Sequence, residues 1–185
     1  PAQKFTKTLI QEDYYADLDQ LGEKLIEINP SALKFISKPE FRQKIESQKA
    51  KVTMQTTLAE FRWLCNEIVA SVNCSHTDMG RFFFEDEMLP TTLRFPLQTR
   101  WTDDKLYVVD PLNNVDQVAV ADEIIRINGV NVGDLMKDIY AHISSQAYVE
   151  TTKKHVFNSL SAVLIPYALN FPKQYSIELK NKAKG

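Results

Sequence analysis

The segment over residues 57–72 carries the clearest helical pattern in this chain, and it ends beside a reactive side chain. Thr57 and Glu60 form a T-x-x-E capping box, which satisfies free amide groups at the start of a helix. Apolar residues then recur three and four positions apart, as on the buried face of a helix: Phe61, Leu64, Cys65, Ile68, Val69 and Val72. Asn73 is typical of a helix end. The pattern predicts a packed helix whose end holds His76 in a fixed position.

Two further amphipathic helices are expected before this one. The first runs from about Asp13 to Asn29, because a residue that precedes a proline is pushed out of the helical conformation. Its apolar face comprises Tyr14, Leu18, Leu21, Leu25 and Ile28. The second begins at Ser37, which is followed by an early proline and by a glutamate at the third position. Three helices with short connections predict a small helical domain over residues 1–80.

Later residues change to the alternation that is typical of strands. Residues 93–97 and 105–109 are expected to form two strands joined by a polar turn, and Pro96 favours an edge position or a bulge in the first. A third strand over 121–127 leads into Asn128–Gly129, the strongest hairpin signal in the chain. The chain is therefore expected to be α+β, with a small helical bundle followed by a mixed domain.

Two helices and a strand complete the predicted elements. The helices cover residues 133–143 and 151–169, and Pro166 is expected to kink or end the second. The last strand is predicted from the alternation of Tyr175, Ile177 and Leu179.

Composition excludes several classes of function. The chain has 185 residues, 44% of them apolar and 25% charged, as in ordinary globular proteins of one or two domains. A net charge of −2 gives no support for nucleic-acid binding. No apolar run approaches the roughly 20 residues of a transmembrane helix. The first residue is Pro1 rather than methionine, so we expect a trimmed or mature chain. Cys65 lies on the apolar helix face and is expected to be a buried free thiol.

Several segments resemble one family of peptidases. Residues 122–132, Asp-Glu-Ile-Ile-Arg-Ile-Asn-Gly-Val-Asn-Val, resemble the G-D-x-I-hydrophobic-x-I-N-G signature of PDZ domains in bacterial proteases. Upstream, Ile28–Pro30, Ser37–Phe41 and Ser75–Thr77 resemble the helical N-terminal region of the C-terminal-processing (tail-specific) and tricorn-type serine peptidases. The order of these segments along most of the chain is similar to their order in that family. The resemblance implies a PDZ-like domain over residues 81–185.

The resemblance also implies roles for His76 and Ser75. In the tricorn-type branch, a histidine of the N-terminal region is the general base for a serine that a later catalytic domain supplies. The serine before it joins the hydrogen-bond network through an acidic partner. Carried over, His76 would be the base and Ser75 the network serine. This role suits imidazole, which titrates near neutral pH and can take the proton of a weakly nucleophilic hydroxyl.

A PDZ-like domain implies a peptide or an unfolded protein as partner. An exposed sheet edge beside a helix can accept an extended peptide as an added strand, or the module can serve only to support the protease. The residues expected near the peptide are Ile124, Ile125, Ile127, Leu135 and Ile139. The family's frequent export, with the missing initiator methionine, predicts the cell envelope or periplasm; the cytoplasm is the alternative.

Two departures from the family pattern bear on function. Ala121 stands where PDZ domains of these proteases often carry glycine, so the turn before the strand is expected to differ. We also find no Gly-rich strand-to-helix serine site, so the chain is expected to be inactive alone and to need a C-terminal catalytic domain. The alternative is a stand-alone peptide-binding adaptor or scaffold without enzymatic activity. No cofactor is expected in either case.

Other reactive side chains give weaker signals. Cys74, His76 and Asp78 could offer three metal ligands, but no fourth ligand is identifiable, and we expect no metal. Cys74 and His76 are also poorly spaced for a nucleophile and its base. The remaining candidates are expected to be packing residues, a solvated face, or surface and satisfied histidines: Phe82–Phe84, Glu85–Glu87, His142 and His155.

Overall fold

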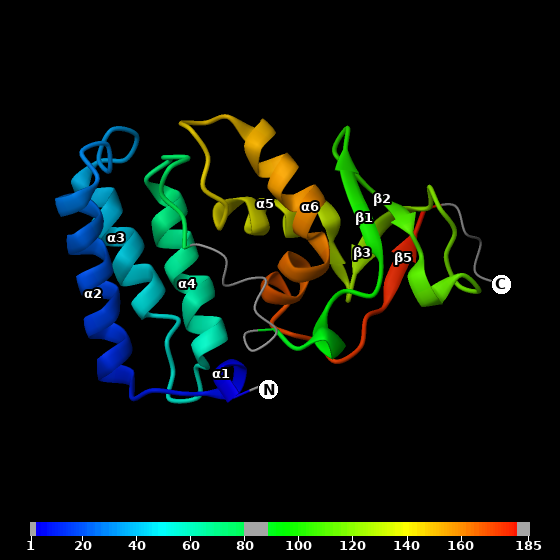
Figure 1. The fold of residues 1–185 in the computed structure, drawn as a ribbon, viewed down its shortest axis with the longest axis horizontal. Helices are drawn as coiled ribbons and strands as arrows, with labels where there is room; N and C mark the ends of the chain where they lie inside the picture. The colour runs from blue at the N-terminus through cyan, green and yellow to red at the C-terminus, as the bar shows by residue number, and fades with distance from the viewer. Residues whose placement is uncertain (1–2, 80–88, 181–185) are drawn as a thin grey trace. The chain divides into compact units, whose positions relative to one another are not determined.

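A computed structural model describes residues 3–79 and 89–180 (Figure 1). The chain divides into two compact units: Pro1–Pro90 with Ala141–Lys153, and Thr91–Tyr140 with Lys154–Gly185. Helices come first along the chain and an antiparallel sheet follows, so the predicted α+β class is confirmed. The domain boundary predicted near residue 80, together with the segments Phe82–Phe84 and Glu85–Glu87, lies outside the described residues.

The first unit is built on helices that lie side by side (Figure 1). They are α1 (Gln3–Thr6), α2 (Gln11–Ile28), α3 (Lys38–Lys49) and α4 (Leu58–Ser71). Both predicted capping boxes are confirmed, since the hydroxyl groups of Ser37 and Thr57 accept hydrogen bonds from the backbone N–H groups of Glu40 and Glu60. In the described part of the chain, no helix combines the length and the apolar character needed to cross a membrane.

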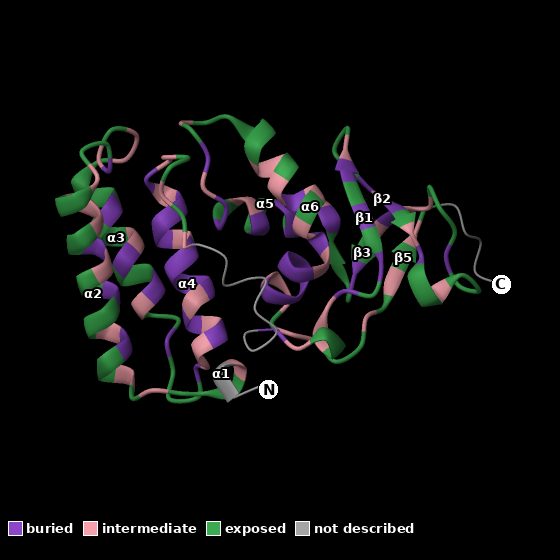
Figure 2. Ribbon diagram, viewed as in Figure 1, coloured by how far each residue is buried: buried purple, intermediate pink, exposed green. Residues whose placement is uncertain are grey.

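The core of this unit lies between α2, α3 and α4 (Figure 2). The predicted apolar face of α4 is buried at every position: Phe61, Leu64, Cys65, Ile68, Val69 and Val72. Tyr14, Leu18 and Phe41 complete its centre and are fully buried. The predicted face of α2 is wrong at Ile28, which is 73% exposed, because the helix ends there and the backbone turns to an extended conformation at Asn29.

The second unit contains a five-stranded antiparallel sheet. Its strands are β1 (Gln98–Thr102), β2 (Lys105–Asp110), β3 (Glu123–Ile127), β4 (Val130–Asn131) and β5 (Ile177–Leu179). The central strand is β3: β5 pairs with one of its edges, while β2 and β4 share the other. Among the described strands, β1 pairs with β2 alone and therefore forms an edge of the sheet.

Two tight turns set the register of the sheet. Asp103 and Asp104 have φ angles of 50° and 56°, and Asn128 and Gly129 have φ angles of 48° and 80°. Positive φ at both central residues is the type I′ geometry that matches strand twist, so the Asn-Gly hairpin is confirmed. The strand predicted over 93–97 is wrong: β1 begins only after Pro96, because proline cannot donate to a sheet ladder.

Two helices pack with this sheet, α5 (Val132–Ala141) and α6 (Glu150–Ala168). Leu135 and Ile139 of α5 face inward and are buried. Pro166 was expected to kink or end α6, but the helix continues through it, and the non-helical backbone lies earlier, at Leu160 (φ −129°, ψ 15°). Proline lacks an N–H group, so Pro166 leaves the carbonyl of Ala162 without its usual helical donor.

The turn before β3 gives a test of backbone strain. Ala121 has a φ of 70°, and a left-handed conformation costs a residue with a Cβ roughly 1–2 kcal/mol. We expect Ala121→Gly to raise the free energy of unfolding by about 0.5–1 kcal/mol. This is the relieved strain minus the cost of the greater conformational entropy that glycine gives the unfolded chain. Urea denaturation measures the change. The control is Ala119→Gly at a neighbouring exposed position without positive φ, which should be neutral or destabilising. A loss of stability in Ala121→Gly would contradict the strain.

Candidate functional site

The predicted general base lies on a turn that two helix ends hold in place. Asn73 leaves α4 with a φ of 51°, and the N–H of Thr77 then donates to the carbonyl of Cys74 at 3.1 Å. Asn29, at the end of α2, donates through its side-chain amide to the hydroxyl of Thr77 at 3.0 Å. His76 sits within this turn and is exposed. The imidazole is therefore accessible to solvent while its backbone is anchored.

Ser75 contacts an amide rather than the acidic partner that the resemblance implies. Its hydroxyl donates to Oε1 of Gln146 at 3.3 Å. The N–H of Ala147 donates to the carbonyl of Asn73 at 2.9 Å, so the segment 141–153 of the same unit runs along this turn. The carboxylate expected for the network is not among the described contacts of Ser75.

The two cysteines are free and lie in opposite environments. Cys65 is buried and unpaired, which confirms the prediction of a buried free thiol, and burial raises the pKa of this thiol to about 12. The pKa of Cys74 is lowered by hydrogen bonds from the side chain of Thr77, from the backbone N–H of His76 and from Asn29. Within residues 3–79 and 89–180, no three His, Cys, Asp or Glu side chains gather as a metal site would require.

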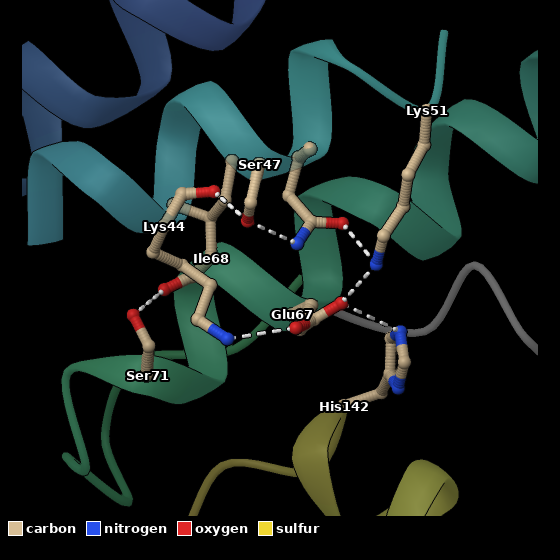
Figure 3. Close-up of polar contacts among 8 residues, drawn as sticks. Lys44, Ser47, Lys51, Glu67, Ile68, Ser71 and His142 are labelled. Carbon is tan, nitrogen blue, oxygen red and sulfur yellow. Dashed lines mark hydrogen bonds and ion pairs between the residues drawn. The ribbon is translucent and has the colours of Figure 1, made fainter.

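A partly buried ion cluster links the segment 141–153 to α4 (Figure 3). Glu67, 12% exposed, accepts from the amine of Lys44 at 2.8 Å and from that of Lys51 at 3.0 Å. Nε2 of His142 lies 3.6 Å from the same carboxylate. The imidazole stacks on Trp63, with ring centres 3.8 Å apart and planes 5° from parallel. His142 is thus a buried, satisfied histidine, which was one of the two expectations for it.

The residues predicted near a peptide lie in the core of the second unit. Ile124, Ile127 and Ile139 are fully buried, Leu135 is 3% exposed and Ile125 is half-buried. Both edges of β3 are already paired by other strands. Their part in peptide binding stays a prediction, and the geometry gives the four buried residues a packing role.

β1 lies beside α6 (Figure 1), and residues of both elements line an open groove. Its volume is about 360 Å³. β1 lines it with Gln98, Thr99 and Arg100, and α6 lines it with Asn158, Ser159 and Ser161. Thr99 is only 4% exposed, and its hydroxyl has no hydrogen-bond partner among the described residues. A buried hydroxyl without a partner costs about 1–3 kcal/mol, so Thr99 places an unsatisfied polar group at the wall of this groove.

Two hydrogen-bonded contacts attach α6 to the chain around β1. The backbone N–H of Trp101 donates to Oδ1 of Asn158 at 2.7 Å, and Nδ2 of Asn158 donates to the carbonyl of Trp101 at 3.2 Å. The carbonyl of Ala162, freed by Pro166, accepts the N–H of Phe95 at 2.9 Å. Asn158 was not predicted as a functional residue from the sequence. Its signal was an asparagine inside an apolar helix, where asparagine is unfavourable without a specific partner.

A larger groove, of about 550 Å³, lies between α2 and α3 in the first unit. Charged side chains on its rim already form ion pairs, since Lys49 contacts both Asp19 and Glu46. Its floor is formed by the buried core residues Phe41 and Ile45. We therefore regard it as a furrow between packed helices.

Comparisons with known proteins leave the family open, because no protein-family model and no curated protein matches this chain.

The ion cluster predicts a pH-dependent stability. Although burial acts to raise it, hydrogen bonds and charges from Lys44 and Lys51 hold the pKa of Glu67 at about 2, below its ordinary 4.5. A lowered pKa stabilises the fold above pH 4.5, and the effect is lost as the pH falls towards 2. We expect Glu67→Gln to lower the free energy of unfolding by about 1–3 kcal/mol at pH 7.

Urea denaturation at pH 7, 4 and 3 checks this prediction. The difference in the free energy of unfolding between Glu67→Gln and wild type should become smaller as the pH falls. The control is Glu46→Gln, which removes an ion pair whose carboxylate side chain is 68% exposed and should change stability by less than about 0.5 kcal/mol. A difference that stays constant from pH 7 to pH 3 would show that the charge of Glu67 does not stabilise the fold.

Proposed function

We propose that this chain forms the peptide-binding and base-supplying part of a serine peptidase of the tail-specific or tricorn type. The observation that carries the proposal is the open groove between the edge of β1 and α6, with the unpartnered hydroxyl of Thr99 in its wall. A further catalytic domain would supply the nucleophilic serine. On this account the chain binds substrate but does not cleave it alone.

The backbone of β1 supports binding of an extended peptide. The N–H and carbonyl groups of Trp101 point away from β2, because both bond to Asn158. Alternate residues of an antiparallel strand direct these groups to the same edge, so those of Thr99 also point into the groove. An extended peptide that adds as a strand would pair with these groups, and the Thr99 hydroxyl would gain a partner.

The turn that holds His76 supports the catalytic half of the proposal. General base catalysis needs an imidazole that is accessible to a nucleophile and fixed in position. His76 is exposed, and hydrogen bonds of Thr77 to Cys74 and Asn29 fix its turn. The resemblance of Ser75–Thr77 to the tricorn-type segment gives the imidazole its role.

A stand-alone peptide-binding adaptor is the second candidate. It is favoured by the fact that the groove is lined by residues of one unit and needs no part of the His76 turn. The two candidates agree on peptide binding and differ on whether His76 matters for activity.

Thr99→Val tests the peptide site. Valine keeps the shape of threonine but removes the hydroxyl, so stability should stay equal or rise, while peptide affinity should fall about three- to tenfold. The measurement is titration with a library of C-terminal peptides, followed by amide chemical shifts of Gln98–Arg100. Thr102→Val, on the same strand but outside the groove, should bind like wild type. Saturable shifts that avoid β1, or none at all, would refute the site.

His76→Ala tests the general base in the full-length protein. Loss of a general base should lower kcat/KM for peptide cleavage about 10²–10⁴-fold and leave peptide binding unchanged. His155→Ala is the control, because this exposed histidine lies on α6 and should not affect cleavage. Cleavage within a few-fold of wild type would remove His76 from catalysis and favour the adaptor.

A further inference from the structure

At one end of the outer edge of β1, the side chain of Asn158 occupies the backbone groups that a neighbouring strand would bind. A peptide group offers one donor and one acceptor to its neighbour, and the side-chain amide of asparagine offers the same pair. Asn158 uses both, since its Oδ1 accepts from Trp101 N–H at 2.7 Å and its Nδ2 donates to Trp101 O at 3.2 Å. Asn158 thus takes the place that one residue of an added strand would occupy opposite Trp101.

The other end of the edge is closed by the backbone of α6. The N–H of Phe95 donates to the carbonyl of Ala162 at 2.9 Å, and this carbonyl is available because Pro166 cannot donate to it. The stretch that remains open is Gln98–Arg100, and the unpartnered hydroxyl of Thr99 lies within it. The edge therefore has a defined length.

We infer that Asn158 sets the length and register of the peptide that this groove accepts, an inference that rests on the proposed peptide-binding function. The bound segment pairs with Gln98–Arg100. It then turns away from β1 before it reaches the position opposite Trp101. Successive residues of a strand advance about 3.4 Å, so an open stretch of this size holds roughly three residues in the extended form. Additional residues on that side gain no backbone hydrogen bond while Asn158 is in place.

The experiment compares wild type with Asn158→Ala by two readouts. The first is hydrogen exchange of the Trp101 amide without ligand, which should become at least about tenfold faster when its acceptor is removed. The second is the affinity for peptides of alternating valine and threonine, with three, five and seven residues and a free carboxylate. When the peptide is lengthened from three to seven residues, the affinity of wild type should rise less than about threefold. The affinity of Asn158→Ala should rise about tenfold, as expected for added backbone hydrogen bonds.

Two further variants keep the test interpretable. His155→Ala changes an exposed residue of α6 that does not line the groove, and it should behave like wild type in both readouts. Asn158→Asp keeps an acceptor for Trp101 N–H but loses the donor to Trp101 O. This variant replaces Asn158→Ala in the experiment if Asn158→Ala does not unfold cooperatively. Because the N–H of Trp101 stays occupied in this variant, the Trp101 amide should remain protected, and the gain in affinity with peptide length should be smaller than in Asn158→Ala.

The outcomes separate the inference from the proposed function. Unchanged Trp101 exchange, or the same dependence on peptide length in both proteins, overturns the role of Asn158 while peptide binding stands. Faster Trp101 exchange without binding of any peptide by either protein overturns the peptide-binding function, and the length rule with it.

Discussion

The attachment of α6 to the edge of β1 is the interaction on which the candidate peptide site depends. It arises from two local features of the sequence: Pro166 frees the carbonyl of Ala162 for the N–H of Phe95, and Asn158 offers an amide to the backbone of Trp101. Without these contacts, α6 would have no hydrogen bond to the edge strand among those described. With them, the edge is held next to a helix and stays open only over a short stretch.

In the first unit, packing and hydrogen bonds hold the turn that carries the exposed imidazole of His76. Burial of the apolar face of α4 supports the helix, and the turn after Asn73 is held by the end of α2 and by the segment 141–153. The ion cluster around Glu67 anchors that segment through His142 and Trp63. Buried charges of this kind are favourable only when each has partners, and Glu67 has two lysines and a histidine close by.

Features that depend on neighbouring residues were predictable from the sequence. The capping boxes at Ser37 and Thr57 and the hairpin at Asn128–Gly129 are confirmed, because their hydrogen bonds and φ angles are set within a few residues. The buried face of α4 is confirmed because its helical period carries through Val72. The same signals gave Asn73 at the end of the helix.

Features that depend on distant partners were not predictable. The start of β1 was misplaced because the alternation over 93–97 resembles a strand, and the effect of Pro96 on the ladder was underestimated. The role of Asn158 could not be predicted because its partner, Trp101, lies far away in the sequence. Ile124 and Leu135, which were expected near a peptide, lie in the core of the second unit, and their part in peptide binding stays a prediction.

The central claim is that an extended peptide pairs with the open edge of β1. Intermolecular nuclear Overhauser effects between a saturating, isotope-labelled peptide and the protein test it most directly. The account predicts cross-strand contacts from the peptide backbone to Gln98–Arg100, together with side-chain contacts to Ser159 and Ser161 of α6. Contacts confined to the edge of β5, or to the helices of the first unit, would contradict it.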